Sequence, residues 1–473
     1  MSVKKNYLYN LLYQMTTVLL PIITIPYVSR ILKDEGVSIN AITNANTQYF
    51  ILIGSLGITI YATKKIATIR DNIDKLRETF WEIFFIQFIG CLISYLFFVF
   101  TLGASKQYGV YYMLQGFFIL SSSVDTSWYF LGIENFKNAS IRSFFVKIIS
   151  VILIFVFIKT PEDLGKYIFI NSFTMFIGQV IMWIYIDKEL LKIQKIGKIH
   201  PYKHLLPILA LFIPQIATQV YTVLDKTMID IFSDTLQVGY YDQSQKIIRI
   251  LLSVVTSLGT VMMPKIANLY SKNQHDEVKN YLRKAFTVIS FLTIPITFGI
   301  MGVSDRFIPM FFGADFISSV QLTQISSVLV IIIGLGNVFG TQYMLATGKN
   351  KEYTKSVCIG AAVNVVLNVI LIPRYSAVGA VIATVLAELS IALTQMLYSR
   401  SVFDLSWIKS TYKFWISGIV MFVIVKIIGN STGIKILVLT KQIVIGVGIY
   451  FGLLIVLREK FIINTFKEIR AKL

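Results

Sequence analysis

Long apolar runs recur through the whole sequence, and they constrain the fold more than any other feature. Each run has about 18 to 25 residues, enough for a helix to cross the ~30 Å hydrocarbon core of a bilayer. Of the 473 residues, 55% are hydrophobic and only 15% are charged, whereas about 25% charged residues is usual for a soluble protein. A segment in lipid must satisfy its own backbone hydrogen bonds, so such runs predict helices. The sequence therefore predicts an all-α polytopic membrane protein.

We expect about fourteen transmembrane helices along the chain. Lys4 and Lys5 precede the first run, which is too long for a secretory signal and is therefore expected to stay as the first helix. The predicted ranges are 7–31, 41–62, 79–103, 109–132, 139–159, 166–187, 205–231, 238–263, 281–303, 316–346, 356–373, 377–399, 412–428 and 439–457.

Basic residues are distributed unevenly between alternate loops. With both termini inside the cell, the cytoplasmic segments and helix ends hold 30 of the 44 Lys and Arg residues, and the outer segments hold 10. Loops rich in Lys and Arg stay in the cytoplasm. We therefore expect a multi-pass protein of the bacterial cell (cytoplasmic) membrane with both termini cytoplasmic. The net charge of +19 is then a topology signal, and no nucleic acid partner is expected.

The sequence carries no recognisable cofactor or catalytic motif. Cys91 and Cys358 lie in apolar runs, so neither a disulfide framework nor a zinc cluster is expected. The three histidines, His200, His204 and His275, lie in basic polar segments and are interpreted as solvated loop residues. Neither a nucleotide-binding glycine loop nor a nucleophile elbow is found. We therefore predict no enzyme activity, no cofactor and no bound metal.

A faint internal repeat has an offset of about 200 residues. SLG at 55–57 returns at 257–259, and KIA at 65–67 returns at 265–267. Two six-helix repeats with two further helices are typical of transporters, whose site lies between the repeats. The predicted domains are an N-terminal lobe over 1–190, a C-terminal lobe over 191–400, and a trailing segment over 401–473 with two helices and a basic cytoplasmic tail.

Polar residues within the predicted helices follow helical spacing. In the clearest stripe, successive members are 4, 3, 4 and 4 residues apart, which places them on one face of a helix. Its members are Asp242, Lys246, Arg249, Ser253 and Ser257. Similar stripes in three other helices predict a polar central cavity, because polar faces in lipid turn inward. The expected cavity lining is Asn10, Gln14, Asn44, Gln48, Gln215, Gln219, Thr222 and Ser253.

Charged residues within or at the ends of the helices are candidates for the binding site. The cations interpreted as ligands of an anionic substrate are Arg30, Lys147, Lys226, Lys246 and Arg249. The acids interpreted as charge-balancing or ion-coupling groups are Asp125, Asp225, Asp230, Asp242 and Glu388. Arg249 has no acidic residue within one turn of its helix. This favours a role as an anion ligand, because its guanidinium matches the geometry of phosphate.

Purely structural roles are the alternative for each group. Three ion pairs would remove cations from the site: Lys226 with Asp230, Asp242 with Lys246, and Asp125 with Lys147. Arg30 could extend to the membrane interface from the end of the first helix. Hydrogen bonds between helices are the alternative for the uncharged polar residues, since such bonds stabilise membrane bundles.

Four separated segments of the chain resemble one family of membrane proteins. They are LLPIITIPYVSRIL near the start, FLGIENFKNASIRS at 130–143, VLDKTMIDIF with the following VGYYDQSQKIIRI and MPKIANLYSKN, and NVVLNVILIPRYSAVGAVIATVLAE at 364–388. In this order they resemble the Wzx-type polysaccharide flippases. These belong to the multidrug/oligosaccharidyl-lipid/polysaccharide (MOP) exporter superfamily, together with the multidrug MATE exporters and the lipid II flippase.

The resemblance implies both a fold and a function. The fold has two six-helix lobes related by a pseudo-two-fold axis in a MATE-like V shape, with two C-terminal helices added. The function is transfer of undecaprenyl-pyrophosphate-linked oligosaccharide units from the inner to the outer leaflet, by alternating access, for capsular polysaccharide, exopolysaccharide or O-antigen synthesis. Membrane lipids are expected partners, and contacts with a polysaccharide polymerase and chain-length machinery are compatible with it. The alternatives are a MATE-like ion-coupled multidrug exporter and, with less support, a membrane polysaccharide polymerase.

Overall fold

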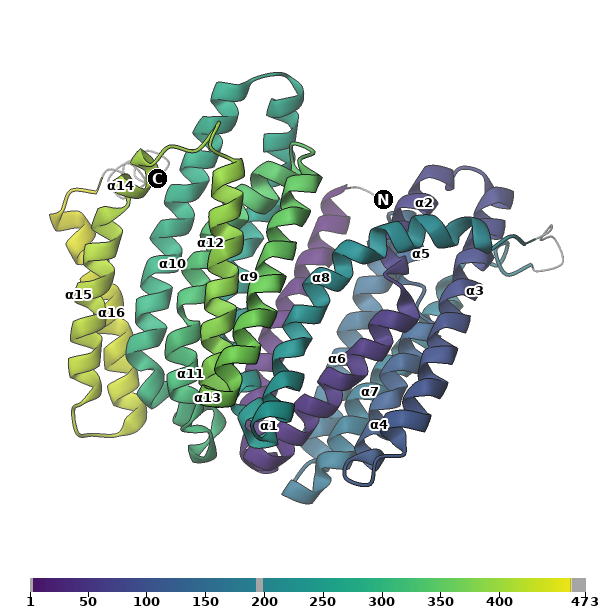
Figure 1. Cartoon of the computed structure of the whole chain (residues 1–473), viewed down its shortest axis with the longest axis horizontal. Helices are drawn as coiled ribbons and strands as arrows, with labels where there is room; N and C mark the ends of the chain where they lie inside the picture. Colours follow the sequence, from purple (N-terminus) through teal and green to yellow (C-terminus); the bar gives the residue numbers. More distant parts are fainter. Residues whose placement is uncertain (1–2, 193–198, 460, 462–473) are drawn as a thin grey trace. The chain divides into compact units, whose positions relative to one another are not determined.

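The computed structural model describes residues 3–192, 199–459 and 461, and the regular structure in this part of the chain is helical (Figure 1). The predicted all-α class is thereby confirmed. Contacts between residues divide the chain into two compact units, Met1–Asp230 and Ile231–Leu473. The sequence predicts two lobes from an internal repeat. A division by contacts does not test whether two repeats exist, so the lobes stay a prediction.

Each unit contains eight α-helices among the described residues, α8 crossing the boundary by its last two residues. The first unit contains α1 (Val3–Ser55), α2 (Ile58–Ile69), α3 (Ile73–Phe98), α4 (Gly109–Ser123), α5 (Ser127–Gly132), α6 (Phe136–Phe157), α7 (Leu164–Met182) and α8 (Tyr202–Phe232). The second contains α9 (Thr235–Ser271), α10 (His275–Phe312), α11 (Ser319–Ser326), α12 (Val328–Phe339), α13 (Asn350–Tyr398), α14 (Ser406–Ser410), α15 (Tyr412–Gly429) and α16 (Lys435–Val456). Short π-helical turns follow α3 (Val99–Gly103) and α12 (Gly340–Leu345).

Many of these helices have the length and composition of membrane spans. In the described residues, nine helical segments are long and apolar enough to cross a bilayer, and ten if the two parts of α9, bent by 41°, count as one span. Leu19–Ile69 and Asn350–Tyr398 have 51 and 49 residues, whereas a single crossing needs about 20. Each contains a break, at Lys33 (φ 56°) and Ser376 (φ 51°), where the chain reverses direction (Figure 1). The number of fourteen helices stays a prediction.

The helix predicted at 41–62 has different boundaries in the structure. The helix resumes directly after the break at Lys33. Within this resumed part, Ser38 Oγ donates to the carbonyl oxygen of Asp34 at 2.7 Å. The same helix ends before residue 62, because Leu56 and Gly57 have φ angles of 49° and 64°. A positive φ is costly for a leucine but not for a glycine. Gly57 adopts this conformation readily and is the N-cap residue of α2.

The helix predicted at 109–132 is interrupted between α4 and α5. Asp125 lies in this break rather than in a continuous helix, and its Oδ1 accepts hydrogen bonds from the Ser127 N–H at 2.8 Å and hydroxyl at 2.5 Å. The side chain thus closes a local turn just before α5, whose N-cap residue Thr126 makes no side-chain capping bond. Gln87 of α3 compensates for the missing helical bonds, because its Nε2 donates to two carbonyl oxygens at the break, at 2.6 and 2.9 Å.

Aromatic side chains fill the core of each unit. In the first unit, Phe80 of α3 and Trp128 of α5 are fully buried and in contact, with ring centroids 5.2 Å apart. In the second unit, Phe286 of α10 packs on Trp407 of α14, and α15 and α16 pack on α10. Many large apolar side chains point outward instead, such as Phe100, which is 78% exposed. Such a surface suits contact with lipid tails.

Candidate functional site

The charged stripe of α9 forms a connected group of side chains. Lys246 Nζ lies 2.7 Å from Asp242 Oδ2, and a terminal guanidinium nitrogen of Arg249 lies 3.5 Å from Asp242 Oδ1. Helix geometry explains the arrangement, because residues four and seven positions after Asp242 lie on the same face. Asp242 therefore holds both cations, and we call these three residues the α9 triad.

The triad corrects one argument drawn from the sequence. Arg249 has no acid within one turn, but Asp242 lies two turns before it and is within reach. The argument from an unpaired arginine is therefore wrong, although the role of Arg249 as an anion ligand stays a prediction. The Asp242–Lys246 pair, considered above as a structural alternative, is present.

The triad is well suited to meet an anion. The Asp242 side chain is only 5% exposed, whereas those of Lys246 and Arg249 are 28% and 55% exposed. Two cations on one carboxylate leave an excess of one positive charge. The guanidinium group has five N–H donors, and Asp242 accepts from one of its nitrogens at the limit of hydrogen-bond distance. The arginine therefore retains donors for a phosphate oxygen.

The neighbouring face of α9 is fixed to the rest of the second unit. Gln245 Nε2 donates to Ser326 Oγ of α11 at 2.9 Å, and the Tyr241 hydroxyl lies 3.4 Å from Thr384 Oγ1 of α13. These contacts determine the rotation of α9 about its axis and so the direction of the triad. Ser253, predicted to line the cavity, donates to the carbonyl oxygen of Ile250 in its own helix at 2.7 Å.

A second polar network joins α1, α4 and α8 in the first unit. Asn46 Nδ2 donates to the Tyr112 hydroxyl at 2.8 Å, and Thr227 Oγ1 donates to Asn46 Oδ1 at 3.3 Å. The Tyr49 hydroxyl lies 3.2 Å from Thr227 Oγ1. None of these residues was singled out from the sequence. Asn46 and Tyr49 are three residues apart and share a helix face, a spacing that could have indicated them.

The cavity-lining residues predicted on the second half of α1 lie near this network. Asn44 Nδ2 donates to Gln115 Oε1 of α4 at 3.4 Å, and Gln115 Nε2 donates to Asn40 Oδ1 at 3.2 Å. For Asn44 this is the hydrogen bonding between helices that the sequence left as an alternative. Gln48 is half-buried on the same helix.

The other predicted charges are distributed over several helices. Asp225 is buried on α8, and Lys226 and Asp230 beside it are half-buried. Arg30 is exposed three residues before the break in α1, Lys147 is half-buried on α6, and Glu388 is half-buried on the second half of α13. The side chains of five predicted lining residues lie outside the described part of the structure: Asn10, Gln14, Gln215, Gln219 and Thr222.

One histidine differs from the sequence interpretation. His204 is not a solvated loop residue, because it is only 2% exposed and lies in the first turn of α8. Its Nδ1 is 2.6 Å from the Tyr61 hydroxyl and its Nε2 is 2.9 Å from Glu82 Oε2. His200 and His275 are exposed, as expected.

Comparison with known proteins identifies the family of the chain. Residues 3–270, more than half of the 473 residues, match the family described as polysaccharide biosynthesis protein. The chain belongs to this family. Family membership follows from the sequence itself and does not depend on the fold.

The names of two curated relatives refer to transport and to flippase activity. The chain is 22% identical over 409 residues to the "Putative O-antigen transporter" of Escherichia coli (strain K12), covering 85% of this chain and 97% of the relative. It is 26% identical over 262 residues to the "Probable low-salt glycan biosynthesis flippase Agl15" of Haloferax volcanii, covering 53% of this chain and 52% of the relative. These names are those of transporters and not of enzymes.

Solved structures show that this polysaccharide biosynthesis protein has the fold of the MOP exporter superfamily. The structure titled "Lipid II flippase MurJ, inward closed conformation" matches with a TM-score of 0.75 and 18% identity, covering 96% of this chain and 100% of that chain. An inward-facing MATE family transporter of the MOP superfamily matches with a TM-score of 0.58 and 12% identity, over 85% and 94% of the two chains. Together with the family match and the relative named as an O-antigen transporter, this fold confirms the expected resemblance to the Wzx-type flippases.

Proposed function

We propose that this protein is a flippase that moves a lipid-linked oligosaccharide from the inner to the outer leaflet of the membrane. The observation that carries the proposal is the match over 97% of the length of a relative named as an O-antigen transporter. The higher TM-score to a lipid II flippase than to the MATE transporter supports the same choice. The glycan would serve the synthesis of O-antigen, capsule or exopolysaccharide.

The proposed cargo is an undecaprenyl-pyrophosphate-linked oligosaccharide. Its pyrophosphate requires cations within an apolar protein, and Lys246 and Arg249 offer an excess positive charge on α9. Arg30, Lys147 and Lys226 of the first unit are further proposed ligands. The membrane potential can drive the step. Moving one charge through 100 mV is worth about 2.3 kcal/mol, so a diester with about two negative charges gains about 4–5 kcal/mol on leaving a negative interior.

The proposed setting is the bacterial cell membrane, with both termini in the cytoplasm. The excess of basic residues in alternate segments supports this orientation. Alternating access is the proposed mechanism, and Asp125, Asp225, Asp230, Asp242 and Glu388 are proposed to balance the cations or to couple transport to an ion. A polysaccharide polymerase with its chain-length machinery would accept the product at the outer face.

Reconstitution tests the function directly. Purified protein in liposomes that contain the lipid-linked oligosaccharide should expose the glycan to a glycosidase added outside. Liposomes with heat-inactivated protein should expose only the fraction inserted in the outer leaflet. If the active protein leaves that fraction unchanged but transports multidrug-exporter substrates, the exporter is the correct function.

Arg249 provides the test at residue level. Arg249→Ala should remove a charge-assisted hydrogen bond to the pyrophosphate, worth about 1.5–3 kcal/mol, and so lower the apparent affinity about 10- to 150-fold. Arg249→Lys should restore only part of it, because an ammonium keeps the charge but not the planar fork. Lys272→Ala, an exposed cation just after α9, is the matched control. Normal transport by Arg249→Ala at normal protein levels would make Arg249 structural.

A further inference from the structure

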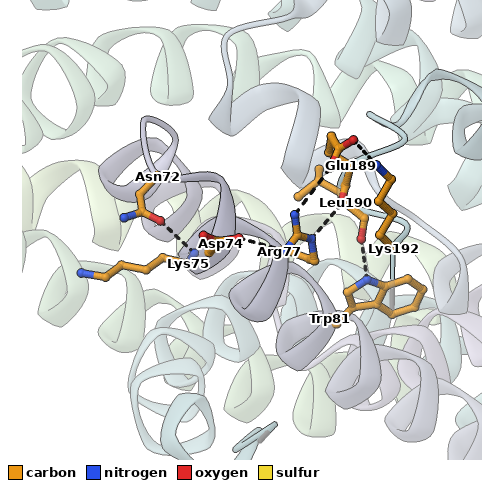
Figure 2. Close-up of polar contacts among 8 residues, drawn as sticks. All are labelled: Asn72, Asp74, Lys75, Arg77, Trp81, Glu189, Leu190 and Lys192. Atoms are coloured by element: carbon orange, nitrogen blue, oxygen red, sulfur yellow. Dashed lines mark hydrogen bonds and ion pairs between the residues drawn. The ribbon is translucent and has the colours of Figure 1, made fainter. Parts of the chain in front are cut away.

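The segment that joins α7 to α8 is held at its first end by two buried side chains of α3. Arg77 Nε donates to the carbonyl oxygen of Glu189 at 2.7 Å, and Trp81 Nε1 donates to that of Leu190 at 2.8 Å (Figure 2). The Arg77 side chain is 3% exposed and also pairs with Asp74 at 3.0 Å. Residues 189 and 190 are therefore attached to α3 through their backbone.

The other end of the same segment is held by the next residue of α3, Glu82. The His200 N–H donates to Glu82 Oε1 at 2.9 Å, while Lys203 Nζ and His204 Nε2 lie 2.8 and 2.9 Å from Oε2. The far side of His204 is held by Tyr61 of α2 at 2.6 Å. Glu82 and His204 are only 1% and 2% exposed.

The chemistry of this contact favours a permanent attachment. A buried carboxylate is costly unless it is paired and hydrogen-bonded. Glu82 has an ammonium, an imidazole and a backbone amide as donors, so its cost is offset only while the segment is in place. Opening the contact would leave the carboxylate in an aromatic core that includes Phe80 and Trp81. The closed arrangement is therefore strongly preferred.

We propose that Arg77, Trp81 and Glu82 form a clamp that fixes residues 189–190, after α7, and residues 200–204, at the start of α8, to α3. The clamp itself stands independently of the cargo, but its consequence for transport rests on the proposed function. Alternating access requires the two units to move relative to each other. With both ends of the segment fixed, the hinge lies beyond the first turn of α8 and not in the connecting segment.

The clamp should weaken in acid. Burial lowers the pKa of His204 below its usual value, although the adjacent Glu82 charge acts in the opposite direction. Tyr61 and Lys65 of α2, Glu82 of α3 and Lys203 are the titratable and charged groups around the imidazole. A lowered pKa means that the closed clamp favours the neutral imidazole. The part of its stability that depends on the neutral imidazole is complete above about pH 6.5, the ordinary pKa of an exposed histidine, and decreases as the pH falls from that value through the lowered pKa.

Hydrogen exchange on the purified full-length protein tests the clamp. Peptides covering 199–206 should be protected at pH 7.5, since the His200 amide is bonded to Glu82. Glu82→Gln should speed their exchange by about tenfold or more, because the charge-assisted bonds are lost. Glu78→Gln, one turn earlier on α3 and half-buried, is the matched control and should leave exchange unchanged. Equal exchange in wild type and Glu82→Gln would overturn the clamp.

A cross-link tests the hinge. Asp74 and Glu189 both lie beside Arg77, so cysteines at these positions, with Cys91 and Cys358 replaced by serine, can be joined by a short bis-maleimide. Glycan exposure in liposomes should continue after cross-linking, because the clamp stays closed during transport. If the cross-linked protein stops while the same protein without cross-linker transports, the segment must move and the inference is wrong. If the wild-type protein does not expose the glycan although exchange shows a closed clamp, the proposed function is at fault instead.

Discussion

The carboxylate of Asp242 carries the clearest energetic prediction. Asp242→Asn keeps the size of the side chain and one carbonyl acceptor, but it removes the negative charge that holds Lys246 and Arg249. The Asp242 side chain is almost completely buried, so the two cations lose a counter-charge that water cannot replace at that position. We expect the second unit of the protein to be less stable. We also expect the α9 face to carry one additional positive charge.

The magnitude follows from the two contacts. The 2.7 Å contact to Lys246 is a charge-assisted hydrogen bond, a type worth about 1.5–3 kcal/mol. The 3.5 Å contact to the 55% exposed Arg249 adds little, about 0–1 kcal/mol as for other solvated pairs. Because the Lys246 side chain is 28% exposed, we expect Asp242→Asn to lower the free energy of unfolding by about 1.5–2.5 kcal/mol.

A double-mutant cycle isolates the pair. Equilibrium unfolding in mixed micelles is measured for wild type, Asp242→Asn, Lys246→Met and the double variant. The coupling energy should be about 1–2 kcal/mol, whereas independent sites add within about 0.5 kcal/mol. A coupling energy below about 0.5 kcal/mol would show that Asp242 and Lys246 do not interact and would refute the triad. Pyrophosphate-lipid binding should persist in Asp242→Asn, in contrast to Arg249→Ala, because the mutation adds to the positive charge.

Three further predictions follow from the structure. Trp81→Phe leaves the buried carbonyl oxygen of Leu190 without its 2.8 Å donor, which should cost about 1–3 kcal/mol and should increase protease cleavage within 187–204, measured by limited proteolysis with Trp415→Phe as control. Gly132→Ala places a methyl group 2.6 Å from Ile66 Cβ and should cost about 1–3 kcal/mol through overpacking, whereas Gly448→Ala meets nothing within 4 Å; unchanged thermal stability of Gly132→Ala would contradict the α2–α5 packing. Maleimide added to intact cells should label cysteines introduced at 234–237 and 430–436 but not at 195–200, of which 195–198 lie outside the described residues; labelling of 195–200 would overturn the orientation.

Much of the fold is predictable from the sequence, because it depends on local properties. Run length alone predicts that a segment crosses the membrane, and spacing alone places Asp242, Lys246 and Arg249 on one face of α9. The interruption after 373 was also predicted, and it coincides with the positive φ of Ser376. The boundary errors at 34–40 and 124–126 have a common cause. Short polar side chains there bond to the nearby backbone, and hydropathy does not measure such bonds.

Contacts between distant residues were not predictable in this way. The pairing of Arg249 was missed because only one turn of its own helix was considered, although the required acid was on the same helix face. The network of Asn46, Tyr112 and Thr227 joins three helices, and no periodicity within one helix indicates which partner a polar side chain will meet. Spacing predicts the face of a helix, but packing decides what that face contacts.

The sequence by itself determined that the chain is a helical membrane protein of the polysaccharide biosynthesis family, because segment length, composition and family motifs are properties of short stretches of residues. Only the tertiary structure decided that His204 is a buried partner of Glu82, a residue 122 positions away. In sequence the histidine lies in a basic polar segment, the typical surrounding of a solvated side chain. Its burial depends on α2, α3 and α8 coming together, and the free energy that favours this contact exists only once all three helices are packed.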